Sequence, residues 1–185
     1  MIPNRPTPEE YGAAISTLLD RLPSSTLKRA RAALEACCQN RKNLFLCGNG
    51  GSAANANHLA TDLIYGVGVR GKPVFAVNSL SSNPSVLTCL GNDTGYEQIY
   101  SRQLKALARA GDLLAVFSGS GNSPNIIQVL RTARKMKVRT IAFLGFDGGS
   151  CLRLADIAIH FHVRDMQLVE DLHMITAHLL FRHLR

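Results

Sequence analysis

The stretch LFLCGNGGSAANANHLATDL, residues Leu44–Leu63, contains the features that decide the fold. It begins with an apolar run typical of a buried strand, passes through a glycine-rich turn at residues 48–52, and continues into a helical segment. In that segment His58 and Asp62 are four residues apart, so they share one face of a helix. The order strand, glycine turn, helix indicates an α/β protein with chemistry close to the turn.

The rest of the chain repeats this alternation of strands and helices. The other apolar runs are also continuous rather than alternating, which is typical of parallel strands covered on both faces. We expect strands at Asn43–Cys47, Pro73–Val77, Asp112–Phe117, Arg139–Leu144 and Asp156–Phe161. Five such strands with helical crossovers predict a doubly wound parallel sheet.

Two helices are expected before the first strand, at Pro8–Leu22 and Ser24–Gln39, with Ser24 or Ser25 as the N-cap of the second. Further helices are expected at Ala53–Tyr65, Pro84–Leu90, Glu97–Arg109 and Pro124–Met136, and a long last helix from about Met166 to Leu184. We find no internal repeat and no long linker. The 185 residues therefore predict one domain, with a helical segment at 1–42 and an α/β core at 43–185.

The composition excludes several classes of protein. A hydrophobic content of 46% with 18% charged residues fits a globular chain and not a disordered one. No run approaches the roughly 18 apolar residues of a membrane span, and the N-terminus lacks the pattern of a signal peptide, so we expect a cytoplasmic protein without a membrane partner. The five cysteines have no metal-like spacing, and we expect reduced thiols.

The net charge of +8 raises the question of nucleic-acid binding. The basic residues do not form one block, however, but lie in the separate segments LKRARAA, NRKN, RTARKMKVR and FRHLR. Most of these resemble solvated helix faces. The distribution argues against a nucleic-acid partner and suits a small anionic substrate.

Two loops after predicted strands have the composition of a phosphate site. One is the glycine turn at 48–52, and the other is SGSGNSPN at 118–125, where Ser123 can cap a helix that begins at Pro124. Backbone N–H groups at the helix start, the helix dipole and the hydroxyls of Ser118, Ser120 and Ser123 would together hold a phosphate. A capped turn with nothing bound is the alternative, but three serines in six residues are more than a cap needs.

The glycine turn also fits the dinucleotide fingerprint G-x-G-x-x-A, from Gly48 to Ala53. That fingerprint needs an acidic residue after the second strand to bind the ribose, and Asn78 stands there instead. We therefore expect neither a nicotinamide nor a flavin cofactor. The SGSGNS segment matches neither the nucleophile elbow nor the Walker loop.

His58 and Asp62 have the spacing of metal ligands, and the last predicted helix contains acidic residues and His178 within VEDLHMITAH. At 100° per residue, Asp171 lies almost in line with His178, and Glu170 lies about 80° away, so periodicity does not choose between the two acids. Imidazole and carboxylate ligands suit Zn²⁺ and similar divalent ions. Ion pairs on two solvent-exposed helix faces are the alternative.

Five segments together resemble the phosphoheptose isomerases of the sugar-isomerase (SIS) domain superfamily. They are CGNGGSAANANHLATDL, LGNDTGYEQIYSRQL, GDLLAVFSGSGNSPNII, FLGFDGG and VEDLHMITAH. The resemblance implies a flavodoxin-like sheet and a homotetramer with active sites near the subunit contacts. It also implies an aldose–ketose isomerase that converts sedoheptulose 7-phosphate to D-glycero-D-manno-heptose 7-phosphate through an enediol.

The resemblance also assigns site residues. The sugar phosphate would contact Asn49, Gly50, Gly51, Ser52, Asp62, Asn92, Asp93, Ser118, Gly119, Ser120, Ser123 and Glu170. One Zn²⁺ per subunit would be bound by His58, Asp62, Glu170 and His178, so the resemblance selects Glu170 over Asp171. We assign the two proton transfers of the reaction to Asp62 and His178.

Four positions depart from the pattern of the family. Asp62 and Glu170 stand where the family usually has Glu and Gln, Gln167 stands where it often has Asp, and Gly119 replaces a threonine between the loop serines. Two other functions are compatible with the superfamily: isomerisation of another sugar phosphate, and non-catalytic binding of a replication initiator. The relatives with the second function lack the catalytic acid, whereas this chain has Asp62 and His178.

Overall fold

The computed structural model describes residues 5–68 and 76–184. Its centre is a sheet of five parallel strands in the order β2-β1-β3-β4-β5. The strands are β1 (Asn43–Gly48), β2 (Ala76–Ser79), β3 (Leu113–Ser118), β4 (Arg139–Leu144) and β5 (Ile157–His160). This strand order is that of flavodoxin-like folds, which confirms the predicted fold class. It places the switch point in strand order between β1 and β3, the two strands whose loops resemble phosphate sites.

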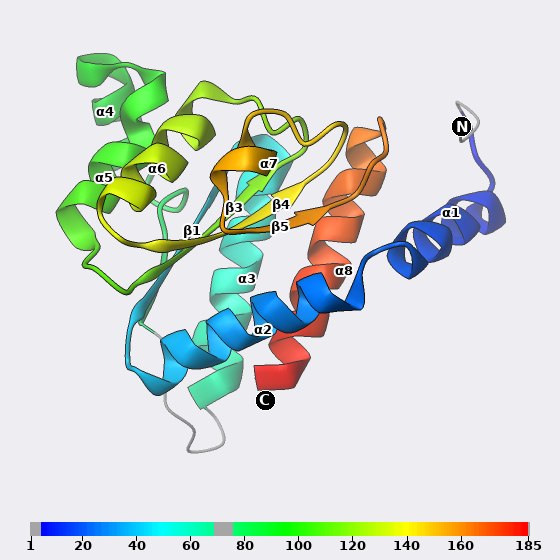
Figure 1. Ribbon diagram of the computed structural model, residues 1–185. Helices are drawn as coiled ribbons and strands as arrows, with labels where there is room; N and C mark the ends of the chain where they lie inside the picture. Colours follow the sequence, from blue (N-terminus) through cyan, green and yellow to red (C-terminus); the bar gives the residue numbers. More distant parts are fainter. Residues whose placement is uncertain (1–4, 69–75, 185) are drawn as a thin grey trace.

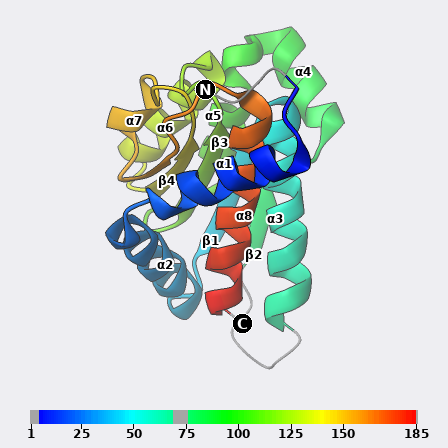
Figure 2. The ribbon, with the colours of Figure 1, turned by 90° about the vertical axis from the view of Figure 1, so that its right-hand side faces the viewer.

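Helices cover both faces of the sheet (Figure 1). One face packs against α2 (Ser24–Gln39), α3 (Gly50–Gly68) and α8 (Met166–Leu184), and the other against α5 (Ile99–Leu107), α6 (Pro124–Lys135) and α7 (Cys151–Leu154). The helix α4 (Pro84–Thr94) and the 3₁₀ turn η1 (Tyr96–Gln98) precede α5. The first helix, α1 (Pro8–Asp20), crosses over α8, as Figure 2 shows.

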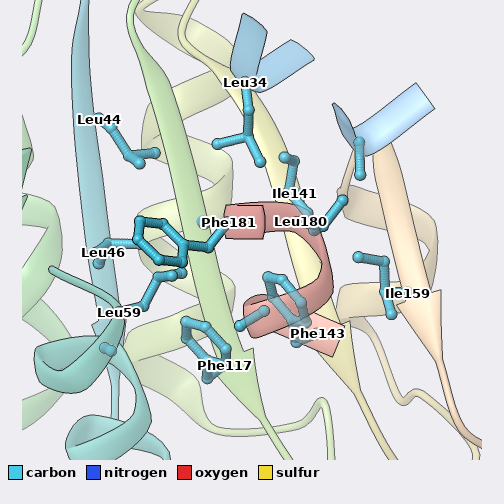
Figure 3. Packing of buried hydrophobic residues seen from close by; sticks show 14 of the residues in the cluster. Leu34, Leu44, Leu46, Leu59, Phe117, Ile141, Phe143, Ile159, Leu180 and Phe181 are labelled. Atoms are coloured by element: carbon cyan, nitrogen blue, oxygen red, sulfur yellow. The ribbon is translucent and has the colours of Figure 1, made fainter. Parts of the chain in front are cut away.

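The core beneath α2, α3 and α8 fixes how these helices lie (Figure 3). Leu46 of β1, Phe117 of β3 and Phe143 of β4 face Leu59 of α3 and Leu180 of α8, and all five side chains are buried. The rings of Phe117 and Phe143 stack with centroids 4.4 Å apart. Because α3 and α8 bury their apolar faces on the same strands, they run side by side in the same direction and present their polar faces together.

Several predicted helix ends are wrong. The first helix ends at Asp20 and not at Leu22, and its start is fixed by a capping box between Thr7 and Glu10. Neither Ser24 nor Ser25 is an N-cap, because the second helix already begins at Ser24 and Pro23 takes the capping position without a side-chain hydrogen bond. Both serines are already part of the helix, so their hydroxyls do not cap its start.

The segments between β1 and β3 differ most from expectation. Of the predicted strand Pro73–Val77, residues 73–75 lie outside the described residues, and β2 runs from Ala76 to Ser79, so Asn78 is inside the strand and not after it. The predicted helix Glu97–Arg109 is a 3₁₀ turn followed by α5, which ends at Leu107.

The one-turn helix α7 was not predicted, because four residues are too few to show helical periodicity. Among the helices described, none combines the length and the hydropathy of a membrane span.

Candidate functional site

A cavity of about 260 Å³ opens at the carboxyl ends of β1 and β3, where parallel sheets of this kind bind ligands. The loop after β1, the loop after β3 and the first turns of α8 surround it. Nine of the predicted substrate-binding residues line it: Asn49, Gly50, Gly51, Ser52, Ser118, Gly119, Ser120, Ser123 and Glu170. The sequence reasoning missed two further lining residues, Phe117 and Met166.

The loop after β1 needs its glycines for its shape. Gly50 has a φ of 53°, in the left-handed region that favours glycine, and a side chain at Gly48 would collide with the backbone of Ser52. The turn allows α3 to begin at Gly50, so the free N–H groups and the positive end of the helix dipole face the cavity.

A network of polar side chains holds this loop against the opposite loop. The amides of Asn49 and Asn125 exchange hydrogen bonds, with N–O distances of 2.9 and 2.8 Å. The buried Tyr100 hydroxyl donates to the carbonyl of Gly48, and the Ser81 hydroxyl donates to the same carbonyl at 3.0 Å. No periodicity or motif in the sequence indicated these partners, which come from four different segments.

The serine loop keeps hydroxyl groups available to a ligand. Ser118 Oγ accepts from the N–H of Gly121 at 3.1 Å, and Ser120 Oγ accepts from the N–H of Asn122 at 3.2 Å, so each fixes the turn by accepting and retains its own O–H. Ser123 takes the predicted N-cap position of α6, but its side chain makes no capping hydrogen bond. These hydroxyls lie at the start of α6, beside a second set of helix N–H groups, which suits an anion.

Two of the residues that depart from the family pattern, Glu170 and Gly119, line the cavity, and the structure shows what each contacts. The Glu170 carboxylate lies directly over Gly51, at the start of α3, where a side chain on Gly51 would stand. The Met166 sulfur lies 2.5 Å from where a Cβ on Gly119 would be, so it fills the space that a threonine side chain needs. Glycine at position 119 and methionine at position 166 are therefore complementary.

His58, Asp62 and His178 come together on the surface between α3 and α8. The two Nε2 atoms are 3.0 Å apart, and Asp62 Oδ2 lies 3.5 Å from His58 Nε2 and 3.4 Å from His178 Nε2. Zinc–ligand distances of about 2.0–2.2 Å in a tetrahedron put neighbouring ligand atoms about 3.3–3.6 Å apart. The three separations are close to this spacing, so the donor set fits a divalent metal with a fourth position open.

The fourth predicted metal ligand lies elsewhere. Glu170 is two turns before His178 on α8, and its carboxylate reaches the cavity instead of the other three side chains. Asp171, the acid that periodicity left as an alternative, accepts a 2.6 Å hydrogen bond from the Tyr11 hydroxyl and is also outside the cluster. Neither acid of this pair joins the three-residue cluster.

Asn92 and Asp93 do not reach the cavity of their own chain. They are exposed near the end of α4, where the Asn92 amide donates to the Asp93 carboxylate at 2.8 Å. Their assignment to the substrate stays a prediction.

Comparison with known proteins places this geometry in a family. The SIS domain model matches residues 10–145. The chain is 38% identical over 166 residues to a phosphoheptose isomerase of Aliarcobacter butzleri, covering 89% of this chain and 86% of that protein. It is 36% identical over 173 residues to one from Chlorobaculum parvum, covering 92% and 82%.

Solved structures agree with these sequence relatives. A phosphoheptose isomerase from Neisseria gonorrhoeae superposes with a TM-score of 0.87 and 29% identity, over 95% of this chain and 93% of that chain. One from Francisella tularensis gives a TM-score of 0.89 at 26% identity, with the same coverage.

Proposed function

The chain belongs to the phosphoheptose isomerases of the SIS-domain family, and we propose that it interconverts sedoheptulose 7-phosphate and D-glycero-D-manno-heptose 7-phosphate. The phosphate would occupy the cavity between the glycine turn and the serine loop. There it would meet the starts of α3 and α6 and the hydroxyls of Ser118, Ser120 and Ser123.

The observation that carries the proposal is the separation between this cavity and the His–Asp cluster. His178 is eight residues beyond Glu170 on α8, which corresponds to about 12 Å along the helix axis. Six carbon–carbon bonds of about 1.5 Å each, together with a phosphoester link, are comparable to this length. A long sugar with its phosphate at the far end could therefore place its carbonyl end near Asp62 and His178, whereas a three-carbon sugar could not.

In this arrangement Asp62 and His178 would move the protons. One would take the proton from the carbon beside the carbonyl, and an acid/base at the neighbouring carbon would return it, so the sugar passes through an enediol. Asp62 Oδ2 and His178 Nε2 are 3.4 Å apart, close enough to act on adjacent carbon atoms of one substrate. Glu170, over the start of α3, would accept hydrogen bonds from sugar hydroxyls between the two ends.

We further propose that His58, Asp62 and His178 bind a divalent metal, with zinc favoured by the two imidazoles and one carboxylate. When bound, such an ion polarises a carbonyl and stabilises negative charge on its oxygen. Glu170 could join these ligands only if its side chain left Gly51. Metal analysis of protein purified without chelator should show close to one equivalent, and His58→Ala should lose it; an equal metal content in both proteins would refute the site.

We also propose that the protein is a cytoplasmic homotetramer. Asn92 and Asp93 are exposed and do not line their own cavity, so they could contribute to the site of a neighbouring subunit. Retention of Asp62 and His178 favours an enzyme over a non-catalytic binding protein.

The decisive experiment is to incubate the purified protein with sedoheptulose 7-phosphate and to follow the sugar by NMR. We expect aldoheptose phosphate signals to grow until equilibrium. Parallel incubations with five- and six-carbon ketose phosphates serve as controls for chain length. If a shorter sugar is converted faster than the heptulose, the assignment of the substrate is wrong. If no sugar reacts, the proposal of an enzymatic function is wrong.

A further inference from the structure

A second hollow with a different character lies at the opposite edge of the sheet, where the strands begin. It has a volume of about 470 Å³ and is lined by Arg29 of α2, by the segment that joins α6 to β4, and by residues just before β5. Four of its lining residues are cations: Arg29, Arg134, Lys137 and Arg139. Arg139 begins β4, so the strand length alone separates this hollow from the serine loop by at least about 16 Å.

Among residues 5–68 and 76–184, none of the four cations has an acidic partner. The ion pairs in the described part of the chain join other residues, and none includes a cation of this hollow. The one carboxylate that lines it, Asp156, has its Oδ2 engaged by the N–H and the hydroxyl of Thr140, both at 2.8 Å. Arg29 donates to the backbone carbonyl of Asp156 at 2.7 Å, and not to the carboxylate.

The neighbouring acid at this edge is also committed elsewhere. Asp112 is buried and accepts from the backbone N–H groups of Asn43 and Arg109 and from the Asn43 amide. It therefore serves to tie the starts of β1 and β3 together. The four cations keep an excess of positive charge in a concave surface.

The helix dipole alone does not account for this charge. Arg134 is in the last turn of α6, where one cation complements the negative helix end, but that end carries only about half an elementary charge. The other three cations come from α2, from the turn after α6 and from β4. Lys137 has a φ of 58°, and its carbonyl accepts from the N–H of Gly111, so the turn that contributes it has a fixed shape.

We propose that this hollow binds a small molecule that carries two or more phosphate groups. Arginine forms bidentate hydrogen bonds with phosphate, and three arginines and a lysine, less the charge of Asp156, can neutralise about three negative charges. The apolar lining consists of Val138 and Leu154, with no aromatic ring on which a base could stack. The lining therefore favours a compact polyphosphate or bisphosphate over single-stranded nucleic acid. The volume is within the range of small-molecule sites.

Pyrophosphate is the probe that tests the proposal, by calorimetric titration in 150 mM salt. Arg134→Gln combined with Arg139→Gln should weaken binding about 10- to 100-fold, because two charge-assisted hydrogen-bonding groups are lost. The matched control is Arg102→Gln, an exposed arginine on α5 outside the hollow, and it should bind like the wild type. Ser120→Ala changes the serine loop and not the hollow, so it distinguishes the two sites. It should leave the binding of pyrophosphate in the hollow unchanged. Thermal melting checks that each variant is folded.

Three results would overturn the proposal. Equal affinity of the wild type and the double variant would show that the hollow does not bind the probe. Arg102→Gln removes one charge and the double variant removes two, so a loss in Arg102→Gln that is half that of the double variant on a logarithmic scale would reduce the effect to net charge. A loss only in Ser120→Ala would place the probe in the serine loop. A short single-stranded DNA that binds more tightly than pyrophosphate, and through the same arginines, would replace the small ligand by a nucleic acid. None of these results depends on whether heptose phosphate is the substrate.

Discussion

Asp62 contacts both histidines of the surface cluster, with Oδ2 at 3.5 Å from one and 3.4 Å from the other. The same oxygen would therefore serve as metal ligand and as acid/base, and these roles compete because a bound cation lowers the basicity of a carboxylate. Without Asp62 only the two histidines would remain, which is fewer than the three protein ligands of a catalytic zinc site. The charge of Asp62 is therefore needed both for binding a metal and for moving a proton.

We expect Asp62→Asn to lower turnover about 10²- to 10⁴-fold, the range for loss of a general acid or base. The amide keeps the shape of the side chain but cannot accept a proton. Steady-state kinetics with heptulose phosphate should show a smaller change in KM, because the phosphate binds in the serine loop. Asp62→Glu is the companion variant, since it restores the residue usual in the family. Wild-type turnover in both would reduce Asp62 to a surface carboxylate.

His173 is buried among aromatic rings on the inner face of α8. Its ring centroid lies 6.1 Å from that of Phe117, 6.0 Å from that of Phe143 and 6.4 Å from that of Phe161. Neither ring nitrogen has a hydrogen-bond partner among the described residues. Burial lowers the pKa of His173 to about 4, although the backbone carbonyl of Leu144 near the ring opposes this shift, and His160 of β5 adds a smaller lowering by Coulomb repulsion. The imidazole is therefore neutral in the folded protein.

This shift predicts acid sensitivity. In the unfolded chain a histidine has a pKa of about 6.5, so between that pH and about 4 the unfolded state binds the proton more readily, and stability falls as the pH decreases. From pH 7 to pH 5 the loss from this one group is about 2 kcal/mol. His173→Leu should be less sensitive to this decrease in pH. Urea unfolding of both proteins at pH 7 and 5 measures it, and parallel losses in the two would contradict the buried neutral state.

Contacts between residues far apart in the sequence mark the limit of what sequence reasoning can predict. The i, i+4 spacing of His58 and Asp62 predicted a shared face, and the structure adds the 3.0 Å contact with His178. The choice between Glu170 and Asp171 could not be made from periodicity, because the bond from Tyr11 to Asp171 joins positions 160 residues apart. Contacts of that range follow from how helices pack and leave no local pattern.

At the scale of elements, the strands were more predictable than the helix ends. β4 was predicted with its exact bounds, and β1 and β3 to within one residue at each end, because buried strands of parallel sheets are continuous apolar runs. The start of a helix depends on which polar group accepts hydrogen bonds from the free N–H groups of its first turn. Thr7 does so for α1, whereas at α2 the serines are already inside the helix.

The contact between the serine loop and α8 gives a prediction at this scale. Gly119→Thr, which restores the residue common in the family, should destabilise the protein by about 1–3 kcal/mol, because the new side chain meets the Met166 sulfur. Shortening the partner in Gly119→Thr/Met166→Ala should recover part of this loss. Thermal unfolding of the two single variants and the double variant gives the coupling.

Gly121→Ala is the control for this pair. Its φ of 66° and the backbone carbonyl of Gly148 in the way leave no flexible side chain that could move aside. It should be destabilised whether or not Met166 is shortened. Additive effects of the Gly119 and Met166 substitutions would show that the sulfur does not oppose a side chain at position 119.

At the scale of the whole molecule, the five-stranded parallel order brings two functional edges to opposite ends of one sheet. The carboxyl ends of β1 and β3 open into the cavity of serine hydroxyls, while the start of β4 borders the basic hollow. Both ends of the sheet have groups that suit anions, but among the described residues only the hollow is lined by cations, because the one charged side chain that lines the cavity is Glu170. The sequence showed that the basic residues were dispersed along the chain, but only the fold shows which of them converge.

The helices α3 and α8, which contain the His–Asp cluster, expose large apolar side chains close to it in sequence, and we expect these side chains to be buried in an oligomer. Ile64 and Tyr65 follow Asp62 on α3 and are 56% and 76% exposed, and Leu179 follows His178 on α8 and is 42% exposed. Large apolar side chains that gather beside a functional site indicate a protein–protein contact more often than a free surface. Light scattering at micromolar concentration should give the mass of a tetramer. Tyr65→Asp should dissociate it, because an interface cannot readily bury an unpaired charge, and turnover should fall with the assembly. Leu107→Asp, on α5 at the other face of the sheet, introduces the same charge at a 52% exposed residue; it is the matched control and should leave the mass unchanged. A wild-type chain that is monomeric and fully active would show that this surface has another use and that one chain contains the whole site.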